Sequence, residues 1–165
     1  MKVKHLNNNV DFLADNYEKQ VALYTEMLKQ AEVMIEAIKE GSEEKMKGTF
    51  ARRQELMKEI DRINSDSKAV IDDVCETLHF KEFKVSKLVK VVHTPGSERL
   101  FAAIGKLSEI LPEIQKIDTE MERTAYEQII KLKADMKLIR NSKNVRNAYY
   151  QAEQPTGPEL LDKKK

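Results

Sequence analysis

An apolar stripe at helical spacing constrains this chain more than any other feature of its sequence. Between residues 10 and 40, apolar residues recur at alternating intervals of three and four: Leu13, Tyr17, Val21, Tyr24, Leu28, Ala31, Ile35 and Ile38. This interval places all of them on one side of an α-helix, as in coiled coils. We therefore predict a helix over about residues 10–40, with N-cap candidates at Asn7 to Asn9 and Gly41 as its terminator.

Two further segments show the same spacing. In the second, Ser42 can cap a helix over residues 43–78, and a kink or break is expected at residues 64–67, where Asn and Ser side chains compete for backbone hydrogen bonds. The third covers residues 97–140, and Pro112 inside it is expected to bend or interrupt the helix. Its stripe comprises Leu100, Ile104, Leu107, Leu111, Ile114, Ile117, Met121, Ala125, Ile129, Leu132, Met136 and Ile139.

The remaining segments connect and follow these stripes. Residues 79–96 interleave apolar side chains with lysines, and Ser86 could cap a short helix there. We interpret this segment as a connector that packs its apolar side across the end of a bundle. The stripe stops at residue 141. We expect the segment after it to start as a weak helix and to continue as a tail that contains prolines. Apolar groups left outside the bundle are Tyr149, Tyr150, Leu160 and Leu161.

These patterns predict an all-α fold. No proline precedes Pro95, and 35% of the 165 residues are charged, a composition that suits helices with one buried stripe. We predict an elongated antiparallel bundle, or coiled-coil-like hairpin, of about three long helices with a short connecting helix. Residues 1–140 would form one domain and 141–165 a flexible C-terminal docking tail. Six residues are predicted to be well buried: Leu28, Ile35, Ile60, Leu107, Ile114 and Leu132.

Charge and cysteine content narrow the function classes. The chain has 29 Lys and Arg against 28 Asp and Glu, so bulk charge argues against a nucleic-acid binder. The lone Cys75 forbids an intrachain disulfide and suits a reducing compartment. No apolar segment follows the basic residues near Met1, so we expect no signal peptide, and no stretch of about 18 apolar residues predicts a membrane span. We expect a cytoplasmic protein with no stable membrane insertion.

Motifs for catalysis are not found in the sequence. It lacks a Walker loop, a dinucleotide-binding glycine pattern, an HExxH pair and a CxxC pair. Glu76 and His79 have the spacing used in di-iron bundles, but such sites need a second motif of this kind. Residues 61–72 resemble a calcium-binding loop but lack its glycine, so we interpret them as a helix break. Cys75 is interpreted as a small side chain packed among apolar residues. We expect no enzyme activity, no cofactor and no metal site.

Three segments together resemble the FlgN-type flagellar export chaperones. They are Glu36-Ala-Ile-Lys-Glu-Gly-Ser, then Phe50-Ala-Arg-Arg-Gln-Glu-Leu-Met-Lys-Glu-Ile-Asp-Arg-Ile, and finally Asn147-Ala-Tyr-Tyr-Gln with the closing Leu160-Leu-Asp-Lys-Lys-Lys. The tail departs from the family at Leu160 and Leu161, where an aromatic residue followed by Ile is expected.

The resemblance implies a small helical protein that holds hook–filament junction (hook-associated) proteins before export. Such chaperones bind amphipathic C-terminal helices of their clients and deliver them to the export gate. On this hypothesis Met121, Ile129, Met136 and Ile139 line or border a groove for the client helix. By similarity, Tyr149 or Tyr150 contacts the export gate. A covering of the groove by the chain's own C-terminal segment is a further expectation.

Other interpretations remain open from the sequence. The related chaperones of the filament cap protein and of flagellin look alike at this level, so the client is undetermined. A homodimeric coiled-coil scaffold would use the same stripes between two chains. A carboxylate-bridged metal enzyme would contain bound iron or manganese. The oligomeric state, and any ordering of the tail on binding, are also undetermined.

Overall fold

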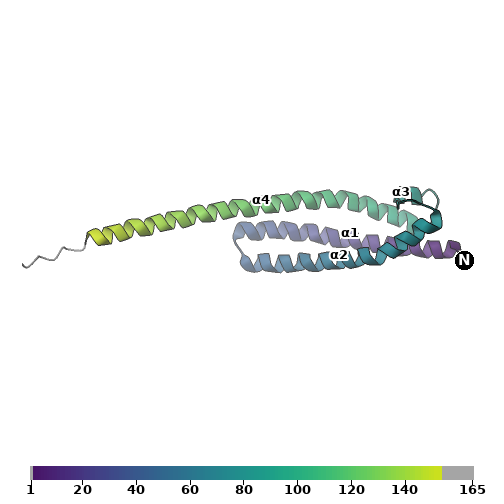
Figure 1. Cartoon of the computed structure of the whole chain (residues 1–165), viewed down its shortest axis with the longest axis horizontal. Helices are drawn as coiled ribbons and strands as arrows, with labels where there is room; N and C mark the ends of the chain where they lie inside the picture. Colours follow the sequence, from purple (N-terminus) through teal and green to yellow (C-terminus); the bar gives the residue numbers. More distant parts are fainter. Residues whose placement is uncertain (1, 154–165) are drawn as a thin grey trace, which may run out of the picture. The chain divides into compact units, whose positions relative to one another are not determined.

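The computed structural model describes residues 2–153, and its contacts divide the chain into two compact units, Met1–Ala125 (unit 1) and Tyr126–Lys165 (unit 2). Most of the described chain is helical and no strand occurs in it, which confirms the all-α prediction. Figure 1 shows the four helices α1 (Lys2–Glu40), α2 (Glu43–Leu78), α3 (Val85–Leu88) and α4 (Pro95–Ala152). Unit 1 contains α1, α2, α3 and α4 up to Ala125, and unit 2 contains the rest of α4.

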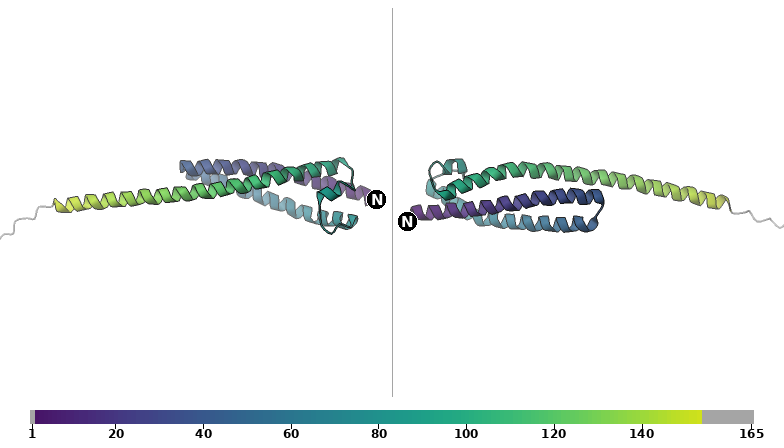
Figure 2. Two further views of the ribbon diagram at one scale, coloured as in Figure 1. Left: turned by 90° about the horizontal axis from the view of Figure 1, so that it is seen from above. Right: turned by 180° about the vertical axis from the view of Figure 1, so that it is seen from behind.

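Helices α1 and α2 form an antiparallel hairpin, which can be followed in Figure 1 and Figure 2. Gly41 adopts φ +69° at the junction, and the Ser42 N–H donates to the Ala37 carbonyl at 3.0 Å. This left-handed geometry closes α1 and is strained for residues with a Cβ. The Ser42 hydroxyl then accepts from the Lys45 N–H at the start of α2. The predicted turn is therefore confirmed.

Two apolar clusters hold unit 1 together. One joins the first part of α1 to the end of α2, to α3 and to the start of α4, and its fully buried members include Leu13, Val74, Leu88 and Leu100. The other brings Met27, Leu56, Ile60 and Ile114 together from α1, α2 and α4. Because α3 contributes Leu88 to the first cluster, the interpretation of residues 79–96 as a packed connector is confirmed.

Ion pairs show the direction in which α4 runs within unit 1. The Arg99 guanidinium donates to Glu18 at 3.0 and 2.6 Å and also to Asp15, so the start of α4 lies beside the first half of α1. Further along α4, Asp118 accepts from Arg53 of α2 at 2.7 Å. Up to Ala125, α4 therefore runs parallel to α1 and antiparallel to α2.

The start of α4 packs very closely on α1. The Thr94 hydroxyl accepts from the Ser97 N–H and the Ser97 hydroxyl accepts from the Thr94 N–H, a reciprocal cap that satisfies two backbone donors. Gly96 lies between these two residues, and a Cβ placed there would clash with the Asp11 carboxylate and lie 3.3 Å from the Asp11 Cα. Only glycine allows the two backbones to approach this closely without a shift.

Two expectations about helix boundaries were wrong. Asn7 to Asn9 are not N-caps, because α1 begins at Lys2 and the Asn9 amide donates to Asp73 of α2 instead. Ser86 does not cap α3 either, since Lys84 occupies the N-cap position. In both places the helix begins at an earlier residue than the local capping pattern predicts.

Neither of the expected interruptions of a helix occurs, while a kink in α2 or a bend in α4 at these places stays a prediction. At residues 64–67 α2 is continuous, and Asn64 and Ser67 accept hydrogen bonds from Gln20 and Asn16 of α1 at 2.9 and 3.0 Å. These polar groups bind across the hairpin, which removes their competition with the α2 backbone. Pro112 does not interrupt α4, and it lies on an exposed side where water can reach the carbonyl whose partner it removes.

The predicted core is confirmed only in part. Ile35, Ile60, Leu107 and Ile114 are buried, and Leu28 is half-buried against the second cluster. The prediction for Leu132 was wrong, since this side chain is 62% exposed. Leu132 belongs to unit 2, whose described residues comprise a single helical segment and offer it no neighbouring element.

Candidate partner-binding helix face

Unit 2 exposes an apolar row on the part of α4 that follows Ala125. We name Ile129, Leu132, Met136 and Ile139 the partner stripe, and each of them is at least half exposed. Their intervals of three, four and three place them on one side of the helix. An apolar stripe of a water-soluble helix normally faces another element, and contiguous exposed apolar surface marks interaction sites. This stripe is therefore the best candidate for contact with a partner.

The alignment of α4 with α1 bears on the exposure of the stripe. The apolar stripe on α4 runs from Leu100 to Ile139, which is about the length of the 39-residue α1. The start of α4 does not lie beside the start of α1, however, because Arg99 pairs with Asp15 and Glu18. Fewer residues of α1 than of α4 therefore follow this contact. The Arg99 contacts are a tertiary feature, so periodicity alone could not assign Leu132 to the surface.

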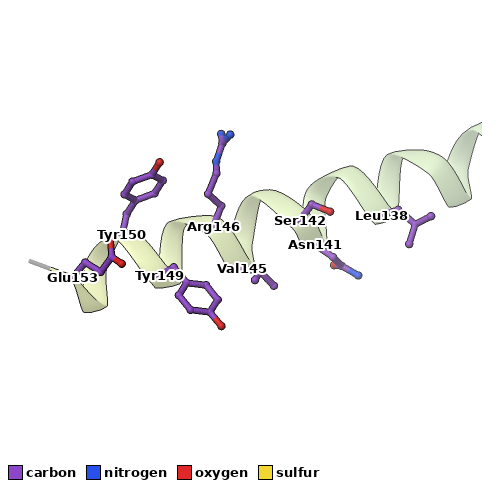
Figure 3. Close-up of a pocket in the computed structure, with 8 residues that line it drawn as sticks. All are labelled: Leu138, Asn141, Ser142, Val145, Arg146, Tyr149, Tyr150 and Glu153. Carbon is purple, nitrogen blue, oxygen red and sulfur yellow. The ribbon is translucent and has the colours of Figure 1, made fainter.

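A second apolar row lies on a different side of the same helix. Leu138, Val145 and Tyr149 project to one side in Figure 3, whereas Arg146 and Tyr150 project to the other. The two tyrosines are 69% and 65% exposed, and neighbouring helical residues point about 100° apart. Tyr149 therefore extends the second row, while Tyr150 continues the line of the partner stripe. Sequence reasoning missed Leu138 and Val145 as members of this surface.

Met121, the remaining predicted client-binding residue, lies in unit 1. Its side chain is half-buried, and its sulfur lies 3.6 Å from an Arg53 guanidinium nitrogen, beside the Arg53–Asp118 ion pair. Ile129, Met136 and Ile139 belong to unit 2. Tyr149 and Tyr150 lie within α4, which continues to Ala152, while Leu160 and Leu161 lie outside the described residues. The predicted tail therefore starts as helix.

Groups capable of chemistry are few in the described chain. Burial and the nearby Asp72 carboxylate raise the pKa of the Cys75 thiol, which keeps it protonated at neutral pH and poorly nucleophilic. His5 Nε2 lies 3.1 Å from Asp73, close to Glu76 and His79 on an open surface. Within residues 2–153, no cluster of His, Cys, Asp and Glu has the arrangement of a metal site.

Fold and surface together define a class: a helical-bundle protein that presents an unpartnered amphipathic helix for binding. None of the helices in the described residues is long and apolar enough to cross a membrane. The model of the FlgN protein family matches residues 1–157, so the chain belongs to this family of flagellar export chaperones. No curated protein and no solved structure matches the chain.

Proposed function

We propose that this chaperone binds an amphipathic C-terminal helix of a hook-associated protein in the cytoplasm and delivers that client to the export gate. FlgN proteins bind flagellar clients, which supplies the class of partner. The observation that carries the proposal is the exposure of Ile129, Met136 and Ile139 on one side of α4. A client helix would bury these side chains in the helix-in-groove mode. The chain would act by binding, without catalysing a reaction.

The tyrosines would serve a separate contact. We assign Tyr149 and Tyr150 to docking on the export gate, because their rings are exposed near the end of the described helix, away from Ile129 along α4. An aromatic ring buries much area for little loss of side-chain entropy, which suits a small docking site. Since the partner stripe and the tyrosines are different residues, client binding and gate docking should be separable by mutation.

Isothermal titration calorimetry with purified hook-associated and filament cap proteins tests client binding. The double variant Ile129→Glu and Met136→Glu should abolish binding, because two carboxylates would be buried against apolar partner surface. The matched control Phe50→Glu and Met57→Glu alters two residues of unit 1 that are exposed to a similar degree, and it should bind as the unmodified chain does. Circular dichroism should show that both variants keep their helices.

Replacement of both Tyr149 and Tyr150 by Ala should leave client binding intact but impair secretion of the client from cells. Absence of binding by the unmodified chain to every client tested would contradict the chaperone mechanism proposed for this stripe. A concentration-dependent dimer detected by light scattering, lost in the Ile129→Glu and Met136→Glu variant, would instead support the homodimeric scaffold.

A further inference from the structure

Basic residues are concentrated around the partner stripe. Residues 131–146 contain six Lys or Arg and one Asp, although the whole chain has a net charge of only +1. Every one of these side chains is exposed. Among residues 2–153, no acidic group forms an ion pair with the six cations: Lys131, Lys133, Lys137, Arg140, Lys143 and Arg146. The segment is therefore a basic amphipathic helix, and the rest of the chain has more acidic than basic residues.

Three of these cations form a row along one border of the partner stripe. Lys133, Lys137 and Arg140 each directly follow a stripe residue, namely Leu132, Met136 or Ile139. Lys133 and Arg140 follow Leu132 and Ile139 at the position that flanks a packed helix, while Lys137 follows Met136 and lies farther round the helix, between the other two along its axis. We call Lys133, Lys137 and Arg140 the basic border. Any helix that packs on the partner stripe brings its own flanking residues close to the basic border.

The line of the stripe becomes basic beyond Ile139. Continuing at intervals of four and three, the next positions are Lys143 and Arg146, before Tyr150. A partner that covers the stripe must therefore meet cations at one end as well as along one border. An entirely apolar partner would desolvate these cations without pairing them, and a basic partner would repel them. Either effect would weaken binding.

A second copy of this chain fits the surface poorly. In an antiparallel pair, the same border of each helix lies together, so the basic border would face its own counterpart. In a parallel pair in register, Lys143 and Arg146 would each oppose themselves inside the contact. Like charges in such positions are destabilising. Charge complementarity favours a partner of opposite sign.

We propose that the partner stripe selects an amphipathic helix of another protein whose apolar side is bordered by Asp or Glu. The carboxylates would pair with Lys133, Lys137 and Arg140, while the apolar residues cover Leu132, Met136 and Ile139. This inference rests on the proposed function and specifies the chemistry of the client helix. Apolar contact supplies most of the affinity, and the basic border supplies selectivity and a faster encounter.

Two designed helical peptides can test this selectivity by fluorescence anisotropy. Both carry the same Leu and Ile stripe, bordered by Glu in one and by Lys in the other. The full chain should bind the Glu-bordered peptide about tenfold more tightly, as expected for three exposed ion pairs. The preference should shrink as salt is raised to about 0.5 M, where exposed charges are screened.

A charge-reversed variant then tests the assignment to particular residues. Lys133→Glu, Lys137→Glu and Arg140→Glu together should invert the preference toward the Lys-bordered peptide. The control changes Lys29, Lys58 and Lys68 to Glu, which alters the net charge equally on exposed residues of unit 1. This control should keep the original preference. Circular dichroism at 222 nm should confirm that both triple variants remain helical.

The possible outcomes separate the two proposals. Binding of neither peptide would contradict helix docking on the stripe and thus the proposed function. Equal binding of both peptides, unchanged by salt, would refute acidic selectivity while leaving helix docking in place. Sedimentation with anionic phospholipid vesicles but not neutral ones, lost in the Lys133, Lys137 and Arg140 variant and without any peptide preference, would assign the basic border to a membrane surface and overturn the inference.

Discussion

Leu107 and Leu132 provide a direct test of where the core of α4 ends. Both belong to the same apolar stripe on one helix, so replacing either by Ala makes the same chemical change with the same small effect on helix propensity. Their environments differ sharply: Leu107 is 6% exposed and Leu132 is 62% exposed. The comparison therefore isolates burial from every local property of the two residues.

The expected magnitudes follow from this difference in burial. Leu→Ala removes three carbon groups, which contribute about 0.8 kcal/mol each when fully buried, and a cavity adds to the loss. At Leu107 we expect the free energy of unfolding to fall by about 2–5 kcal/mol. At Leu132 most of the side chain already contacts water, so the loss should be about 1 kcal/mol or less.

Urea unfolding followed by circular dichroism at 222 nm measures both effects. The measurement should be repeated at two protein concentrations tenfold apart, because self-association would make stability depend on concentration. A loss of more than 2 kcal/mol for Leu132→Ala that disappears on dilution would show that a second copy buries the stripe. An equal loss at both positions, independent of concentration, would refute the exposed assignment of Leu132.

Three further predictions concern contacts within unit 1. Gly96→Ala should lower the thermal midpoint, because the added Cβ clashes with α1, whereas Gly105→Ala has nothing within 4 Å and should raise stability by about 0.5–1 kcal/mol. Ser67→Ala should lower the free energy of unfolding measured in urea by about 1–3 kcal/mol, because it leaves a buried amide of α1 without its acceptor. The hydrogen bond from Arg99 lowers the pKa of Glu18. The ion pair therefore stabilises the fold fully above the ordinary Glu pKa, and this stabilisation is lost as pH falls through the lowered pKa. Arg99→Gln should raise that pKa in an NMR titration, and its stability should converge with that of the unmodified chain at low pH.

Much of the helical architecture was predictable from local physics. The intervals of three and four identified the long helices, and Gly41 with Ser42 located the turn between α1 and α2, since left-handed backbone and N-cap geometry are properties of adjacent residues. The partner-stripe residues Ile129, Met136 and Ile139 were also visible as part of a periodic pattern. A pattern of this kind predicts that one side of a helix is apolar, whatever covers it.

The tertiary structure decided what lies opposite each pattern. Asn64 and Ser67 would weaken an isolated helix, but α1 supplies their hydrogen-bond partners, and α2 stays continuous. Leu107 and Leu132 are equivalent in spacing, yet only Leu107 has neighbouring helices to bury it. Periodicity is a property of one helix, whereas burial depends on the length and position of another, which is why the sequence by itself determined the helices and only the packed structure separated core from binding surface.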